Sequence, residues 1–537
     1  MKRNLLYFFL FSCQIYSFAQ QDAWVYLADK ENVEQSLSNP ISILTQKAID
    51  RKSTHNIVID ERDVPVNESY ISQLKLQSVI TVLAKSKWFN AVHVRGSQTD
   101  IEALSSLSFV SSIDFADKNL NTTRSVQHQN KFEIEETLTD FNYGNALNQI
   151  EMFNGDELHI EDYSGDGMTV AVLDAGFPNV HNLTSFQRLR EAGNILGTYD
   201  FVGRDNDVYT NTTSSHGTLV LSDMAGYVQD QFVGTAPDAS YYLFITEDAP
   251  NENPIEESFW VEAAERADSL GVNVINTSLG YTTFDNPNYN YSTSDMDGNT
   301  AFISRGANIA FEKGMLLVNS AGNSGNGSWG IVGAPADASG VLSVGAVDPN
   351  GDYASFSSRG DSTQTSQKPD VVAQGQSSYV ITQNDIITTA NGTSFSSPIL
   401  AGGVTCLWQA LPSLTNAQIM QLVRESASQY NNPDNFLGYG IPDLQVALNT
   451  GLSLVDNEVQ ELDLRIYPNP VSDEIYLGVP DDEKVSINIF DILGKLVVES
   501  YFDSIKNNVN VSTLSKGIYI AKLQSGNKSN TIKLIKE

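Results

Sequence analysis

The sequence predicts an α/β fold in the middle of the chain, with a parallel sheet flanked by helices. A small α+β domain is expected before it and a small all-β sandwich after it. Between residues 136 and 450, apolar strands alternate with amphipathic helices; residues 20–135 show a shorter β-α-β alternation; residues 462–537 contain short strands without helices. Repeated strand-helix-strand units favour a parallel sheet with right-handed crossovers, and a run of short strands favours a sandwich.

Length and charge narrow the class of protein. At 537 residues the chain is too long for one domain. It holds 32 basic and 65 acidic residues, which gives a formal net charge of −33. Phosphate binding requires a basic face, so this balance argues against nucleic acid and anionic membranes as partners.

The first 19 residues have the pattern of a secretory signal. Lys2 and Arg3 precede the apolar run 5–11, and small residues stand around Ala19, where cleavage requires them. The apolar run is much shorter than the ~20 residues that a membrane-spanning helix needs. A lipoprotein processed before Cys13 is a weaker alternative. Once Cys13 is removed with the signal, Cys406 has no disulfide partner, and we expect it to be a small buried apolar side chain.

Residues 20–135 are expected to form the first folded unit. Strands are predicted at 23–27, 91–94 and 109–115, and helices at 41–52 and 70–86, an arrangement that suits a small ferredoxin-like domain. The polar stretch 117–129 is a candidate cleavage linker.

The central domain is expected to begin near Tyr143. It should contain strands at 241–245, 272–278 and 315–319 and helices at 255–270 and 301–313. Glycines at 271 and 314 are typical helix ends.

Three segments of this domain carry residues suited to nucleophilic catalysis. Asp174 ends a strand expected to be buried on both faces, where ligands of parallel sheets bind. His216 stands at a predicted helix start, behind two serines. Ser394 follows a Gly-Thr turn and begins an apolar helix, so free backbone N–H groups and the positive end of the helix dipole lie beside its oxygen. Each residue alone could be a cap or a structural side chain.

Together, the order Asp174, His216, Ser394 and the sequences around these residues resemble the subtilisin-like serine peptidases, or subtilases. The matching blocks spread over roughly 140–450: 170–176, 216–218, 319–325 and 392–398, with weaker matches at 278–280, 355–360 and 368–373.

The resemblance implies a mechanism for these residues. Ser394 would be the nucleophile, His216 its general base and Asp174 the carboxylate that orients the imidazole. Asn323 would donate from its side-chain amide in the oxyanion hole.

The resemblance also implies where substrate binds. Ser278, Leu279 and Gly280 would pair with an extended substrate. With Ala321 and Gly322 they would line the first specificity pocket. Ala336 is expected at its floor, which would leave room for a large apolar side chain. Phe395 stands where many subtilases carry methionine.

The two terminal domains have expected roles by resemblance as well. Residues 20–135 would be a propeptide that assists folding and inhibits the enzyme until it is removed. After a linker at 451–461, residues 462–537 resemble the C-terminal sorting domain of type IX secretion substrates, on the motifs at 467–471, 489–495 and 514–519. Export through the periplasm and outer membrane, to the medium or the cell surface, would follow. A generic binding sandwich is the alternative for this domain.

The chemistry requires no cofactor. Structural calcium is common in subtilases, and the segment 295–299 offers Asp295, Asp297 and Asn299 as oxygen ligands, although a solvated turn explains it equally well. Asp162 and Asp166 could in the same way be calcium ligands or belong to a solvated turn. The expected partners are protein or peptide substrates and the outer-membrane secretion machinery, with no nucleic acid, and the enzyme is expected to be a monomer.

Three functions follow from these observations. The first is a secreted serine endopeptidase made as an inhibited precursor. The second is an acyl-transferring peptide ligase that uses the same acyl-enzyme. The third is a non-catalytic surface-binding protein on a peptidase scaffold, which the intact set of Asp174, His216, Asn323 and Ser394 disfavours.

Overall fold

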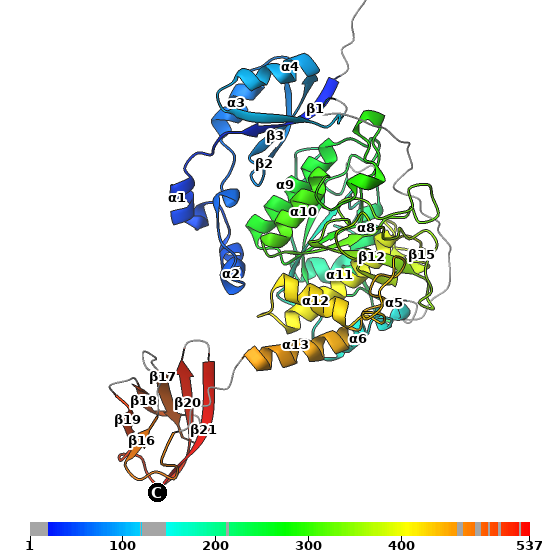
Figure 1. Ribbon diagram of the computed structural model, residues 1–537. Helices are drawn as coiled ribbons and strands as arrows, with labels where there is room; N and C mark the ends of the chain where they lie inside the picture. The colour runs from blue at the N-terminus through cyan, green and yellow to red at the C-terminus, as the bar shows by residue number, and fades with distance from the viewer. Residues whose placement is uncertain are drawn as a thin grey trace, which may run out of the picture. The chain divides into compact units, whose positions relative to one another are not determined.

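The computed structural model describes residues 20–118, 120, 146–210, 214–458, 466–477, 485–491, 495–502, 506–525 and 528–537. The predicted signal segment 1–19, most of the predicted cleavage linker 117–129, and Tyr143 lie outside the described residues. The chain divides into two compact units, residues 1–448 and 449–537, and each is considered by itself (Figure 1).

The first unit begins with a four-stranded antiparallel sheet in the order β2-β3-β1-β4. Its strands are β1 (Gln20–Leu27), β2 (Thr81–Ser86), β3 (Ala91–Ser97) and β4 (Val110–Phe115). Helices α3 (Glu68–Lys75) and α4 (Gln98–Ala103) lie against it (Figure 1). The apolar sides of the helices, including Ile101 of α4, form one core with Val25 and Val92 of the sheet.

The predicted helix at 70–86 is wrong in its second half. α3 ends at Lys75, and residues 81–86 form β2, which pairs with β3 from Thr81 opposite Arg95 to Ser86 opposite Ala91. The apolar spacing continues past the helix, but β-branched Thr81 and Val82 suit a strand and β3 supplies the hydrogen bonds. The predicted helix at 41–52 begins later, as α2 (Gln46–Thr54), because the Thr45 hydroxyl accepts from the Ala48 N–H and caps it.

The central domain is built on a seven-stranded sheet in the order β13-β12-β11-β10-β5-β9-β6, in which every pairing is parallel. The α/β fold with a parallel sheet is thus confirmed. The strands are β5 (Thr169–Asp174), β6 (Ile195–Asp200), β9 (Ser240–Ile245), β10 (Val274–Thr277), β11 (Leu316–Ser320), β12 (Val341–Val347) and β13 (Val371–Gln374). Apart from the edge strand β6 and two residues of β9, their side chains are buried, as expected for strands covered on both faces.

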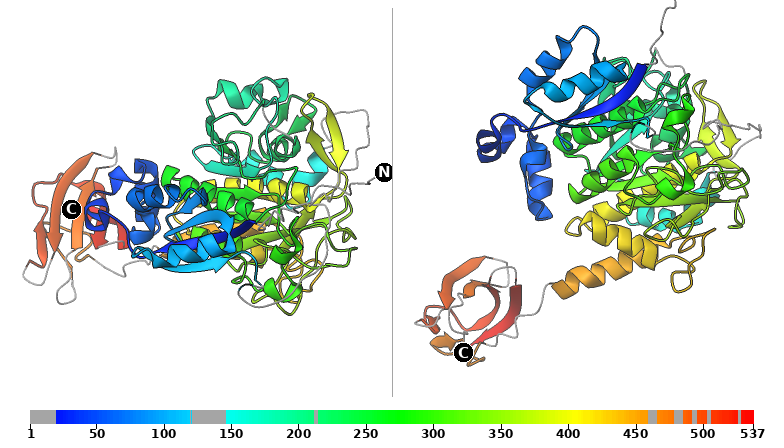
Figure 2. Two further views of the ribbon diagram at one scale, coloured as in Figure 1. Left: turned by 90° about the horizontal axis from the view of Figure 1, so that it is seen from above. Right: turned by 45° about the horizontal axis from the view of Figure 1, so that its top comes forward.

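Helices cover this sheet. α11 (Thr393–Ala410) runs along β10 to β13 and packs on α8 (His216–Ala225). α9 (Ile255–Leu270) and α10 (Phe302–Glu312) pack against each other, and β2 of the N-terminal sheet lies on α9 (Figures 1 and 2). Cys406 on α11 is free and buried, as predicted.

Further short elements complete this unit. The helices are α1 (Val33–Ser38), α5 (Leu147–Glu151), α6 (Gly155–Ile160), α7 (Gln187–Glu191) and α12 (Asn416–Glu425), and the strands are β7 (Tyr227–Val228), β8 (Phe232–Val233), β14 (Ser378–Ile381) and β15 (Ile387–Ala390).

The N-terminal domain is joined to α9 and α10 by buried polar contacts. Asp268 on α9 accepts from Arg51 at 2.5 Å and lies 2.9 Å from Lys52. Lys313, directly after α10, lies 2.8 Å from Asp63 of the N-terminal domain. Glu265 accepts from the backbone N–H groups of residues 87 and 88, each at 3.0 Å. Charges removed from water to this degree require such pairing.

The described residues of the second unit from 466 onward form an all-β domain, as predicted. A four-stranded antiparallel sheet has the order β18-β17-β20-β21, and β16 pairs with β19. The strands are β16 (Glu474–Tyr476), β17 (Val485–Phe490), β18 (Leu496–Phe502), β19 (Asn508–Asn510), β20 (Gly517–Ser525) and β21 (Lys528–Lys536). Helix α13 (Leu444–Glu458) occupies most of the segment expected to be a linker, whose last residues, 459–461, are not described. Among the described residues, no helix is long and apolar enough to cross a membrane.

Candidate active site

Candidate residues lie at the carboxyl ends of three neighbouring strands of the parallel sheet. β5, β10 and β11 lie side by side. Asp174 is the last residue of β5, Ser278 follows β10, and Ala321 follows β11. Because the carboxyl ends of parallel strands share one edge of a sheet, segments more than 100 residues apart in sequence converge there.

His216 is the first residue of α8 and faces Asp174. Its Nδ1 lies 2.9 and 3.0 Å from the two carboxylate oxygens of Asp174. The Ala175 N–H also donates to this carboxylate, at 2.7 Å. Asp174 is 1% exposed and His216 3%, so the pair is held in a site of low dielectric. A carboxylate at Nδ1 favours the tautomer that carries its proton there, which leaves Nε2 as the acceptor.

Ser394 is the second residue of α11 and is tied to Ser278. Its hydroxyl donates to the Ser278 carbonyl at 3.2 Å, and the Ser278 hydroxyl donates to the Ser394 carbonyl at 2.9 Å. Gly392 before the helix has φ of 154°, a backbone conformation that side chains rarely adopt. Ser394 is 7% exposed and lies in the first turn of the helix, at the positive end of its dipole.

The helices that carry His216 and Ser394 pack against each other. The ring of Phe395, next to Ser394, lies 6.1 Å from the imidazole of His216, measured between centroids. Phe395 is buried against Leu219 and Val380. Its packing fixes the start of α11 beside the start of α8.

Asn323 is oriented by the residue that precedes the serine. Its Oδ1 accepts from the Thr393 N–H at 2.9 Å and from the Thr393 hydroxyl at 3.0 Å. The same hydroxyl accepts from the Gly322 N–H at 3.0 Å. Since the amide oxygen is engaged, the NH₂ group is left to donate. An added Cβ at Gly392 would lie 3.4 Å from it, so glycine keeps this approach open.

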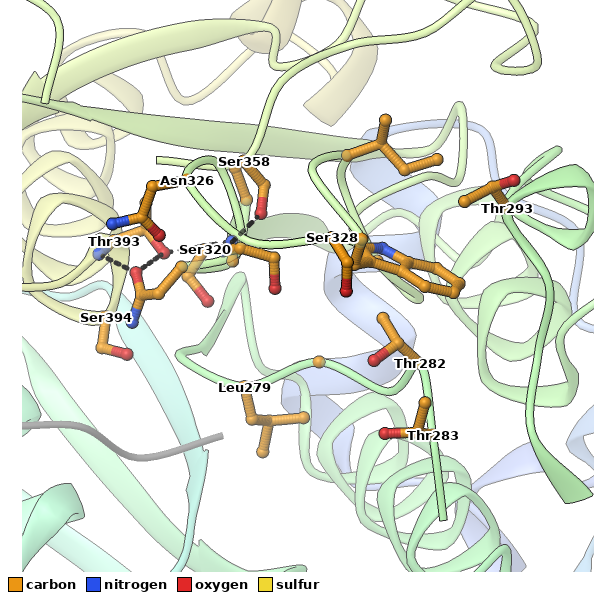
Figure 3. Close-up of a pocket in the computed structure, with 18 of the residues that line it drawn as sticks. Leu279, Thr282, Thr283, Thr293, Ser320, Asn326, Ser328, Ser358, Thr393 and Ser394 are labelled. Atoms are coloured by element: carbon orange, nitrogen blue, oxygen red, sulfur yellow. Dashed lines mark hydrogen bonds between the residues drawn. The ribbon is translucent and has the colours of Figure 1, made fainter. Parts of the chain in front are cut away.

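A pocket of about 420 Å³ opens beside Ser394 (Figure 3). Its lining includes every residue predicted to bind substrate, together with the oxyanion candidate and the serine: Ser278, Leu279, Gly280, Ala321, Gly322, Asn323 and Ser394. Ala336 is not among the lining residues, contrary to prediction; it is buried in a cluster with Ala321 and Val332. Gly333 lines the pocket in that region.

Several lining residues were not predicted from the sequence. Thr282, Thr283, Ser320, Ser328 and Trp329 belong to the pocket. Ser320 ends β11 inside the matching block 319–325, where only Ala321, Gly322 and Asn323 were assigned roles, and the other four lie outside the matching blocks. Thr393 was also missed, although its place in the Gly-Thr-Ser turn could have indicated its role.

The residues proposed for calcium have other uses in the structure. Asp297 accepts from the backbone N–H groups of Asn299 and Thr300 at 2.8 and 2.7 Å, and Asp295 accepts from that of Ser292 at 2.7 Å. These carboxylates stabilise turns. Across the described ranges, no group of three or more His, Cys, Asp or Glu side chains is placed to hold a metal ion.

Comparison with known proteins agrees with this geometry. Residues 165–440 match the subtilase family, residues 22–133 the peptidase S8 propeptide domain of Bacteroidota, and residues 465–537 the secretion system C-terminal sorting domain. The chain is 30% identical to subtilisin DY of Bacillus licheniformis over 301 residues, which are 56% of this chain and 97% of the relative. It is 30% identical over 300 residues to subtilisin E of Bacillus subtilis (strain 168), covering 56% of this chain and 70% of the relative. Subtilisin Savinase of Lederbergia lenta is 29% identical over 290 residues, which cover 54% and 93% of the two chains.

The sorting domain indicates export to the cell surface or medium, and the propeptide indicates synthesis as a precursor. The parallel sheet, the family match over half of the chain and the identity to subtilisins lead to one assignment. The chain is a serine endopeptidase that belongs to the subtilase family.

Proposed function

We propose that the exported enzyme hydrolyses peptide bonds of extracellular proteins through Ser394, His216 and Asp174. The observation that carries this proposal is the buried His216–Asp174 pair, with Nδ1 2.9 Å from the carboxylate, at the N-terminus of a helix packed on the helix of Ser394. Asp174 favours the tautomer in which Nε2 can accept a proton, and it stabilises the imidazolium once it forms.

The Ser394 hydroxyl must leave the Ser278 carbonyl before it can react. An extended substrate that pairs with the segment at Ser278 would donate its own backbone N–H to that carbonyl. The hydroxyl is then displaced and turns toward Nε2 of His216. Substrate binding and nucleophile activation are therefore linked through one carbonyl oxygen.

The reaction then proceeds in two halves. Oγ of Ser394 attacks the carbonyl carbon while its proton passes to Nε2 of His216. The Asn323 NH₂ group and the Ser394 backbone N–H stabilise the oxyanion. The imidazolium gives its proton to the leaving amine, the C–N bond breaks and an acyl-enzyme forms. Water, deprotonated by His216, then releases the acid and restores the serine.

Casein hydrolysis by the matured full chain tests this proposal. Wild type is expected to hydrolyse casein, and Ser394→Ala and His216→Ala are expected to be inactive with unchanged circular dichroism. The matched control is Ser339→Ala, an exposed serine outside the site. Full activity of Ser394→Ala would refute the proposal. Peptides joined in place of hydrolysed ones, detected by mass, would indicate an acyl-transferring ligase.

A further inference from the structure

The pocket beside Ser394 has unusually polar walls for a site expected to take an apolar side chain. Eleven of its twenty lining residues are serine or threonine, and none of the twenty is charged. The large side chains are Trp329, Leu279 and Ile331, which form parts of the wall. The volume of about 420 Å³ is sufficient for any side chain.

Several hydroxyls in this pocket lack a protein partner. Within the described parts of the chain, the hydroxyls of Thr282, Thr283, Ser320 and Ser328 have no hydrogen bond to another residue. Ser320 is only 4% exposed and Thr283 only 8%. Figure 3 shows the hydroxyls of Thr282, Ser320 and Ser328 directed into the space between these residues. Thr282 is half-buried and Ser328 is exposed, so all four hydroxyls must be satisfied by water or by whatever enters the pocket.

An apolar side chain would displace that water and leave the hydroxyls without partners, which costs binding. A charged side chain would enter a pocket with no opposite charge among its lining residues. Asp295, which accepts from the rim residue Ser292, is already paired with Lys118 at 3.0 Å. The side chain that binds here with the smallest loss of binding free energy is uncharged and ends in a group that both donates and accepts hydrogen bonds.

We propose that this pocket selects peptide bonds that follow an uncharged side chain with a hydrogen-bonding end, of which glutamine is the simplest example. The selectivity rests on the proposed endopeptidase function. Thr282, on the segment that follows β10, and Ser320, the last residue of β11, would contact that end. Sites that hydrogen-bond a substrate reject the analogue that lacks the polar group, because their own polar groups are then left unpaired.

Matched peptides test the proposal on the matured enzyme produced from the full chain. One series varies only the residue before the scissile bond among glutamine, methionine, glutamate and lysine, which are similar in length. A second compares tyrosine with phenylalanine. The value of kcat/KM is expected to be at least ~10-fold higher for glutamine than for methionine and glutamate, and higher for tyrosine than for phenylalanine.

The variant Thr282→Val/Ser320→Ala removes two hydroxyls with little change in shape. It should bring the ratio of kcat/KM for glutamine to kcat/KM for methionine close to one, whereas Ser339→Ala should retain the wild-type ratio. Methionine or phenylalanine cleaved as fast as its polar counterpart by wild type would overturn the proposal, whether or not the variant folds. Failure to cleave any peptide would instead refute the endopeptidase mechanism on which it rests.

Discussion

Ser278 and Ser394 exchange two hydrogen bonds, hydroxyl to carbonyl in each direction, at 2.9 and 3.2 Å. The bond from the Ser278 hydroxyl has a particular cause. The Ser394 carbonyl would normally accept from the N–H four residues later in α11, but that residue is Pro398, which has none. The Ser278 side chain supplies the missing donor. The substrate-binding segment therefore holds the first turn of the helix that carries the nucleophile.

Ser278→Ala is expected to destabilise the protein by about 1–3 kcal/mol, because it leaves a buried carbonyl without a donor. The measurement is chemical denaturation in the Ser394→Ala background, which retains this carbonyl and prevents self-digestion. Ser339→Ala, at an exposed position, is the control and should change little. Equal stability of the two variants would show that the bond contributes nothing.

Asn323→Ala is expected to lower kcat by roughly 10²–10³-fold with little change in KM, because the amide donor acts on charge that develops in the transition state. Asn326→Ala removes the same group from a lining residue of the same loop and should leave kcat nearly unchanged. A rise in KM alone in the Asn323 variant would indicate a role in ground-state binding instead.

Asp268→Asn is expected to speed release of the N-terminal domain. The substitution removes the carboxylate that pairs with buried Arg51 and Lys52, and breaking a buried pair costs about 3–5 kcal/mol. The lag before activity appears in the maturing full chain should shorten, and the N-terminal fragment should separate earlier in gel filtration. Glu312→Gln disrupts the ion pair between Glu312 and Arg62 across the same interface. Because the Glu312 side chain is 57% exposed, this pair contributes little, and the lag should change little. An unchanged lag in the Asp268 variant would contradict this role of the buried cluster.

Glu257 should make the precursor less stable as pH rises from 4.5 to 7. Burial on α9 raises the pKa of its carboxyl to about 7 from an ordinary value of 4.5, although the Tyr291 hydroxyl and the Ile303 N–H donate to it. Between these pH values the unfolded chain releases a proton that the folded chain keeps, so the free energy of unfolding falls. Below pH 4.5 the carboxyl is protonated in both states. Above pH 7 it is ionised in both, and the free energy of unfolding stays about 3 kcal/mol below its value at low pH.

Glu257→Gln keeps an oxygen that can accept from the Ile303 N–H, places an NH₂ group that can donate to the Tyr291 hydroxyl, and removes this titration. In the Ser394→Ala precursor it is expected to raise stability at pH 8 and to leave it nearly unchanged at pH 4, as followed by denaturation across the pH range. A gain of the same size at both pH values would show that the carboxyl does not titrate in this window.

The sequence predicted most of the residues at the sheet edge, because each one ends a strand or begins a helix. Asp174 closes an apolar strand, His216 and Ser394 begin helices, and these positions are encoded locally. The misread second half of helix 70–86 depends on a partner that only the folded chain provides, the strand β3. The polar pocket could not be predicted for the same reason, since its hydroxyls come from segments that only the fold brings together.

The most direct test of the catalytic account is covalent labelling of the matured enzyme with a fluorophosphonate, followed by peptide mass spectrometry. The account predicts one modified peptide, with the label on Ser394, and labelling at least ~10³-fold slower in His216→Ala and slowed in Asp174→Asn. A wild-type enzyme that hydrolyses casein but carries the label on another residue, or labels equally fast without His216, would contradict it.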